Sequence, residues 1–193
     1  MSSDHQSESR SETPSGAVPT GASMAAEVRL RGEPLLDALE QHQPGSRQRA
    51  EATGSYAFAV AVALGLSRDG AELCREAAKL SDIGRMYESE DPYLDGSRLA
   101  LGAGVPTEVC DWIILTRERY DGEGPQRLAG AQIAIAARIS RAAAACERAL
   151  SQPELDQEDH RAQAVAKLRA AAGRELDPEI VAALVGVLEA TRR

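Results

Sequence analysis

The chain has 193 residues and a mass of 20.5 kDa, which suits one domain with a sizeable core and is too small for two ordinary domains. Its formal net charge of −8 repels polyanions, and no basic stripe favours nucleic-acid binding. Alanine is abundant and aromatic residues make up only 3%, which favours closely packed helices over sheets. The composition therefore predicts an all-α protein.

The cysteines and the hydropathy pattern indicate the compartment. Cys74, Cys110 and Cys146 are far apart and lack C-x-x-C spacing, so they fit reduced core thiols in a cytoplasmic protein. No apolar run approaches the roughly 20 residues that span a bilayer, and the first residues form no apolar signal segment. We therefore expect a cytoplasmic location, without secretion or membrane insertion.

The first segment of the chain differs in composition from the rest. Residues 1–26 are rich in Ser, Thr, Gly, Pro and charge, with almost no large apolar side chain. Such a segment cannot bury enough apolar surface to fold, so we predict a disordered tail over 1–32 and a folded domain over 33–193. Pro34 fits the first turn of a helix that ends near His42.

The next two segments predict helices. Ser46 is a suitable N-cap for a helix through Leu64. Residues 56–64 alternate large apolar residues with alanine and are also compatible with a strand, although length and alanine content favour a helix. A third helix is predicted over 71–80.

Glycine and proline punctuate residues 88–106, which predicts irregular structure with at most a turn or two of helix. Further helices are predicted over 107–119, 129–150 and 157–172, and from Asp177 to near the C-terminus. A loop separates the first two of these helices.

Residues 81–85 read Ser-Asp-Ile-Gly-Arg and follow the apolar end of the 71–80 helix. This stretch resembles the His-Asp-Ile-Gly-Lys signature of the HD superfamily of metal-dependent phosphohydrolases, particularly its HD-GYP branch. The resemblance extends from about residue 35 to residue 188, and the segment RERYDGEGP at 117–125 resembles the loop that names the branch. It implies an HD-domain-like bundle of about six to eight helices, related to cyclic di-GMP phosphodiesterases.

The resemblance also locates the positions of the metal ligands. In the signature, the adjacent His and Asp ligate metal and the basic residue faces the substrate phosphate; these positions are Ser81, Asp82 and Arg85 here. The remaining ligand positions fall on Arg49, on or near Asp91, and on Thr116, Arg117 and Ala144. Only Asp82 clearly matches a ligand of the family, and an arginine has no lone pair to offer a metal. We therefore expect a degenerate site with no metal, no other cofactor and no enzymatic activity.

Two accounts of the vacated pocket remain open. Arg49 or Arg117 pairs with Asp82 and turns the site into scaffold, or Arg49, Arg85 and Arg117 converge on a cavity and bind an anion. The GYP-like loop forms a turn that the resemblance implies is a surface for protein partners; its residues are Tyr120, Asp121, Gly122, Gly124 and Pro125.

The leading functional hypothesis is a non-catalytic regulatory or protein-interaction module, which the resemblance places in bacterial cyclic-dinucleotide signalling. The alternative is a sensor that binds cyclic di-GMP or a similar nucleotide without hydrolysing it. A homodimer is compatible with either hypothesis. A helix-turn-helix regulator is disfavoured because we find no recognition helix rich in Arg and Lys.

Overall fold

The computed structural model describes residues 23–151 and 157–190, and these residues form helices without any β-strand. In chain order the helices are α1 (Met24–His42), α2 (Ser46–Ala63), α3 (Arg68–Lys79), η1 (Ile83–Met86), α4 (Pro92–Gly102), α5 (Thr107–Leu115), η2 (Gly130–Gln132), α6 (Ile135–Leu150), α7 (Gln157–Ala171) and α8 (Pro178–Ala190). The all-α prediction is confirmed. Within the described ranges, no helix is long and apolar enough to cross a membrane.

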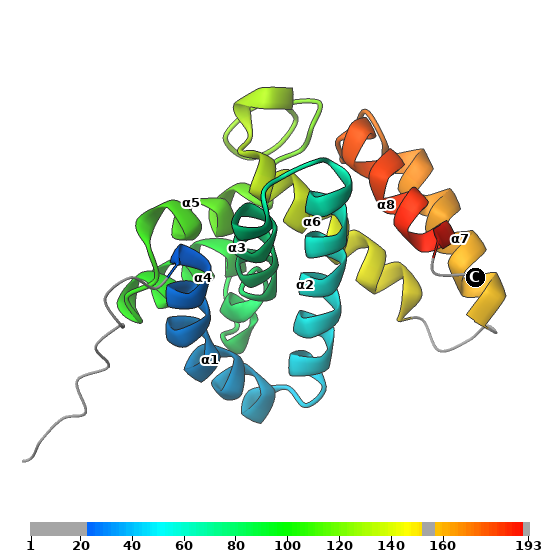
Figure 1. Cartoon of the computed structure of the whole chain (residues 1–193). Helices are drawn as coiled ribbons and strands as arrows, with labels where there is room; N and C mark the ends of the chain where they lie inside the picture. Colours follow the sequence, from blue (N-terminus) through cyan, green and yellow to red (C-terminus); the bar gives the residue numbers. More distant parts are fainter. Residues whose placement is uncertain (1–22, 152–156, 191–193) are drawn as a thin grey trace, which may run out of the picture.

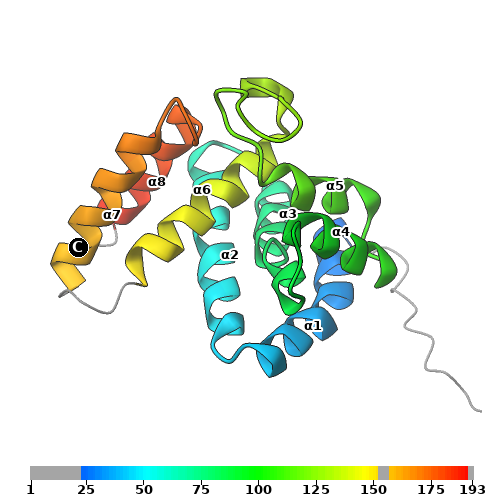
Figure 2. The same ribbon diagram turned by 180° about the vertical axis from the view of Figure 1, so that it is seen from behind.

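Two hydrophobic cores hold the helices together. α2, α3, α6, α7 and α8 enclose the larger core, whereas α1, η1, α4 and α5 enclose the other with residues from the end of α3. α6 packs against α2, α3, α5, α7 and α8, so it is the central helix. The α7–α8 pair lies on one side of α6 and α2, and α1 and α4 lie on the other (Figures 1 and 2).

The first helix begins earlier than predicted. Ser23 is its N-cap, and the hydroxyl accepts a hydrogen bond from the Ala26 amide at 3.3 Å. Val28 is fully buried in the second core, so residues 24–32 belong to the folded domain, and the predicted boundary at residue 33 is wrong for them. Pro34 lies inside α1 rather than in its first turn. The disorder predicted for residues 1–22 concerns residues outside the described ranges.

The segment predicted to be irregular contains α4, a helix of eleven residues. Asp91 is its N-cap and Pro92 occupies the first turn, a combination that favours helix initiation. One glycine of this segment, Gly96, has a packing role against Gly84 of η1. Gly84 in η1 approaches α4 so closely that an added Cβ would lie 1.7 Å from the carbonyl oxygen of Pro92, and Gly96 lies against Gly84 in turn.

The other predicted helices are present with shifted ends. Residues 46–63 form a helix rather than the alternative strand, and α7 and α8 begin where predicted. α5 ends at Leu115 instead of Arg119, and α6 starts at Ile135 instead of residue 129. The residues between these two helices form a loop that projects from the bundle (top of Figure 1).

Candidate functional site

The signature-like residues lie at the turn between α3 and η1. Ser81 is buried and its hydroxyl donates to the carbonyl oxygen of Ala78 at 2.8 Å, so its side chain faces its own helix. Asp82 is 42% exposed at its side chain and pairs with Arg85, 48% exposed, across 3.0 Å. The Asp82 carboxylate raises the pKa of Arg85, and Tyr93 acts in the same direction.

The predicted pairing of Asp82 with Arg49 or Arg117 is wrong. Arg117 pairs with Asp91, the N-cap of α4, whereas Arg49 donates to the Ser46 hydroxyl at 2.8 Å. Asp82 needs no distant partner, because an i,i+3 neighbour is within reach and the carboxylate is half in water. Of the carboxylates that the structure describes, none lies within ion-pairing distance of Arg49.

Four of the predicted pocket residues line one cavity of about 140 Å³, which we call the motif cavity. They are Arg49, Ser81, Asp82 and Arg85. A volume of this size corresponds to about five water molecules at ~30 Å³ each, so the cavity has room for one phosphate-sized group. Its wall therefore brings together positions on α2 and after α3 that the family resemblance assigns to metal ligands.

Among the residues that line the motif cavity, arginines outnumber carboxylates. Arg148 from α6 joins Arg49 and Arg85 in its lining, and the lining acids are Asp82 and Glu147. Lys79 also lines the cavity, but it is buried and neutralised by ion pairs; its partners are Glu33, Glu51 and Glu76. The three arginines thus face two carboxylates, one of which already pairs with Arg85.

The two predicted ligand positions after α5 do not line the motif cavity. Thr116 is buried, and its hydroxyl donates to the carbonyl oxygen of Trp112 at 2.9 Å. Arg141 from α6 donates to the carbonyl oxygen of Thr116 at 3.1 Å and to that of Glu175 at 3.1 Å. A guanidinium thus occupies the neighbourhood of the Thr116 and Arg117 positions.

Sequence reasoning missed Arg141 and Arg148. Burial lowers the pKa of Arg141, and the positive charges of Arg148 and Arg119 add to that effect, although Tyr93 and Glu175 oppose it. Arg141 and Arg148 are seven residues apart, which puts them on the same face of a helix. This seven-residue spacing of two arginines in an alanine-rich helix is the sequence pattern from which they could have been predicted.

The GYP-like loop is held by a buried carboxylate that sequence reasoning also missed. Glu118 is 1% exposed and accepts hydrogen bonds from the amides of Gln126 at 2.9 Å and Leu128 at 3.4 Å. Gly124 passes so close that an added Cβ would lie 2.5 Å from a carboxylate oxygen of Glu118. This contact explains why the loop needs glycine at position 124.

The rest of the loop is tied together and to the C-terminal helices. Gly122 has a φ of +84°, which glycine adopts easily, and Pro125 is exposed. Tyr120 and Asp121 donate backbone hydrogen bonds to the turn between α7 and α8 at Glu175 and Arg174. The Arg119 guanidinium lowers the pKa of Asp121 to about 2. The predicted loop is therefore an ordered turn, and its role as a partner surface stays a prediction.

Comparison with known proteins identifies the family. The sequence profile described as HD domain matches residues 33–180. The chain belongs to the HD domain family. No curated protein sequence matches this HD domain significantly.

Solved structures share the fold at low sequence identity. Bd1817, an HDG"Y"P protein from Bdellovibrio bacteriovorus, has a TM-score of 0.63 at 14% identity over 89% of this chain and 74% of that chain. The HD domain of the L. monocytogenes phosphodiesterase PgpH, in complex with cyclic-di-AMP, has a TM-score of 0.57 at 18% identity, over 82% of this chain and 96% of that chain. Another structure of the PgpH HD domain has a TM-score of 0.58 at 16% identity, over 83% and 99%.

The residues at the motif cavity do not fit the metal centre that the family implies. Divalent metals need several His or carboxylate donors that converge at about 2.0 to 2.2 Å. No cluster of three or more His, Cys, Asp or Glu residues that could hold a metal occurs among residues 23–151 and 157–190. Asp82 is the remaining matched donor, and one of its oxygens accepts from Arg85. The donor set around this cavity therefore suits an anion better than a cation.

Proposed function

We propose that this HD domain is a non-catalytic regulatory module that binds a phosphate-bearing ligand in the motif cavity and leaves the ligand intact. Arg49 carries the proposal: it lines the cavity and its bond to Ser46 uses one donor of a five-donor fork. Such a guanidinium binds an oxyanion strongly, because charge-assisted hydrogen bonds are about twice as strong as neutral ones. Arg85 and Arg148 add two positive charges to the same wall.

The donor chemistry supports binding without hydrolysis. Metal-assisted hydrolysis of a phosphodiester needs an ion that generates hydroxide and stabilises the charge developing on phosphorus. Here Arg49 and Arg117 stand at positions where the family resemblance expects ligands, and neither can donate a lone pair. Their charge also repels a metal cation. A cavity of this composition holds the phosphate and lacks the means to cleave it.

The relatives suggest which phosphate compounds to test first. The PgpH HD domain was solved with cyclic-di-AMP, and Bd1817 is described as an HDG"Y"P protein. The motif cavity, with about 140 Å³, accommodates one phosphate group, so the remainder of a nucleotide would extend beyond it. Cyclic dinucleotides are therefore the first candidate ligands.

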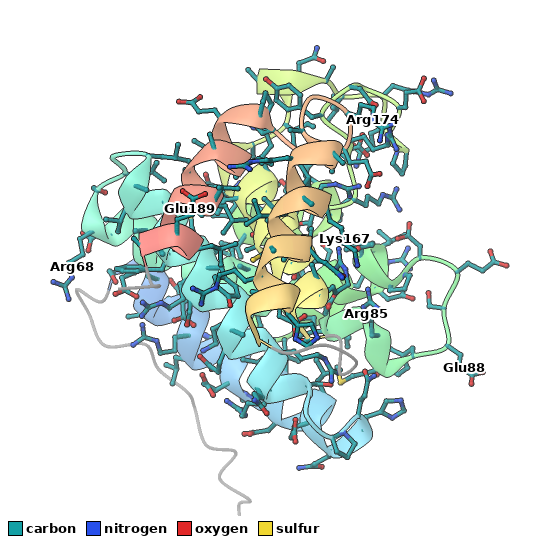
Figure 3. All side chains as sticks on the ribbon, turned by 90° about the vertical axis from the view of Figure 1, so that its right-hand side faces the viewer. Arg68, Arg85, Glu88, Lys167, Arg174 and Glu189 are labelled. Atoms are coloured by element: carbon teal, nitrogen blue, oxygen red, sulfur yellow. The ribbon has the colours of Figure 1, made fainter. Side chains whose placement is uncertain are left out.

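The test is calorimetric titration of the full chain with inorganic phosphate, cyclic di-GMP and cyclic-di-AMP. Arg49→Gln should weaken binding at least tenfold. Arg68→Gln is the matched control and should have no effect, because Arg68 lies on the opposite side of the molecule from Arg85 (Figure 3). Chromatography after prolonged incubation with added manganese or iron should recover the nucleotide intact. Absence of binding, or turnover of the nucleotide, would contradict the proposal.

The projecting loop supports a second candidate role, a protein-interaction surface. Glu118 and the turn at Glu175 hold the loop in one shape, and an ordered projection loses less entropy when a partner binds. Asp121→Ala with Pro125→Ala should abolish capture of a protein partner without changing the melting temperature by more than a few degrees. A partner that still binds this double variant would exclude the loop as its binding surface.

The three free, buried thiols support a cytoplasmic location.

A further inference from the structure

A second cavity lies beside the motif cavity, between α6 and α7. It has a volume of about 390 Å³, within the range of small-molecule sites. Its charged lining residues are Arg141, Arg148, Lys167 and Glu175, and alanine and leucine side chains form the rest. Arg148 lines both cavities, so they share a wall.

The charge of this second cavity is also positive. Among the described residues that line it, Arg141, Arg148 and Lys167 are cationic and Glu175 is acidic, and Lys167 has a further interaction of its own. The Glu175 carboxylate lies 3.6 Å from the Arg141 guanidinium and is 47% exposed at its side chain. Several cations around one cavity favour binding of an anion; burial lowers the pKa of Arg141, and the charge of Arg148 acts in the same direction. Glu175 is itself an anion at this place and competes with an external one.

We propose that the α6–α7 cavity is a second anion subsite, so that the ligand is an elongated molecule with two separated anionic groups, one in each cavity. The inference rests on the proposed function for the first group and adds the second. Arg148 stands between the two groups and contacts both. Figure 3 shows Arg85 and Lys167, which belong to different cavities, on the same side of the molecule.

The experiment uses inorganic phosphate as a one-anion probe and a series of alkane bisphosphonates of increasing chain length as two-anion probes. Calorimetry on the full chain should show one range of chain lengths that binds at least tenfold more tightly than phosphate. Lys167→Gln should remove most of that advantage and leave the Arg49-dependent binding of phosphate within twofold. Glu175→Gln should increase bisphosphonate affinity several-fold. Arg68→Gln should change neither probe.

The outcomes separate the two proposals. If phosphate binds through Arg49 but no bisphosphonate of any chain length binds more tightly than phosphate, the second subsite is refuted and the proposed function stands. The second subsite is equally refuted if Lys167→Gln weakens phosphate and bisphosphonates by the same factor. If neither probe binds, both proposals fail. Bisphosphonate binding that depends on Lys167 but not on Arg49 would refute the motif cavity as the first site.

Discussion

Replacing Asp82 by Asn removes one negative charge from the motif cavity and keeps the shape of the side chain. The Asp82–Arg85 pair is about half exposed, and pairs of this kind contribute ~0.2–1 kcal/mol, so the free energy of unfolding should fall by less than about 1 kcal/mol. An anion bonded to the far side of Arg85 would lie roughly 6.5 Å from the Asp82 carboxylate, because a hydrogen bond of about 3 Å lies on each side of the guanidinium. At an effective dielectric constant of about 40, removing that repulsion gains about 1.3 kcal/mol, or nearly tenfold in affinity.

Urea denaturation and phosphate titration of the same Asp82→Asn protein measure the two quantities. Asp82→Ala is the companion variant, and it should behave alike because the side chain makes no buried contact that truncation would empty. A loss of 3 kcal/mol or more would mean that Asp82 neutralises a buried charge, which is the scaffold account of the two that the sequence leaves open. Unchanged or weaker phosphate binding would refute the anion assignment of this cavity.

Three further predictions concern the fold. Gly84→Ala should destabilise the protein by at least about 3 kcal/mol in urea denaturation, because the added Cβ meets backbone atoms. The control is Gly186→Ala in α8, where the added Cβ meets nothing within 4 Å, and this variant should be more stable by roughly 0.5–1 kcal/mol. Asp91→Ala should cost about 1–2 kcal/mol through the lost cap of α4, and Asp91→Asn, which can still cap, should cost less. Burial raises the pKa of Cys74 to about 11 and that of Cys146 to about 12, so the unfolded chain loses these protons first and stability should fall as the pH rises above about 9. The free energy of unfolding should fall by at most about 1.4 kcal/mol per pH unit for each of the two thiols, and this fall should become smaller when both cysteines are replaced by alanine. Equal pH dependence with and without the thiols would contradict this assignment.

Local patterns predicted most helices, because periodic apolar residues and caps act within a few residues of the chain. The failures came where one residue type has two structural uses. Pro34 suits a first turn, but it lies inside α1 because Val28, upstream of it, is buried. Gly96 suits a loop, but it lies in α4 because the backbone of Gly84 passes beside it. The packing of distant segments decided both cases.

The candidate site was predictable only in part, for a related reason. The resemblance predicted that Arg49, Ser81, Asp82 and Arg85 lie around one cavity, because these positions follow from the alignment of whole helices. It did not reveal which charges pair, because the sequence gives no distances. It also missed Arg148, since an arginine in an alanine-rich helix reads as a solvated residue until the neighbouring elements are in place.

Arg141 joins the end of α5 to the turn between α7 and α8 through two backbone carbonyl oxygens, those of Thr116 and Glu175. Every amino acid supplies such an oxygen, so substitutions at 116 or 175 leave an acceptor available there. In these two backbone hydrogen bonds only the donor side depends on residue identity, although the Glu175 carboxylate also lies 3.6 Å from the Arg141 guanidinium. The two bonds therefore survive substitution of Thr116 or Glu175, whereas replacing Arg141 removes both at once. Bonds to backbone oxygens produce no covariation by themselves, so methods that infer contacts from paired substitutions would overlook these two links.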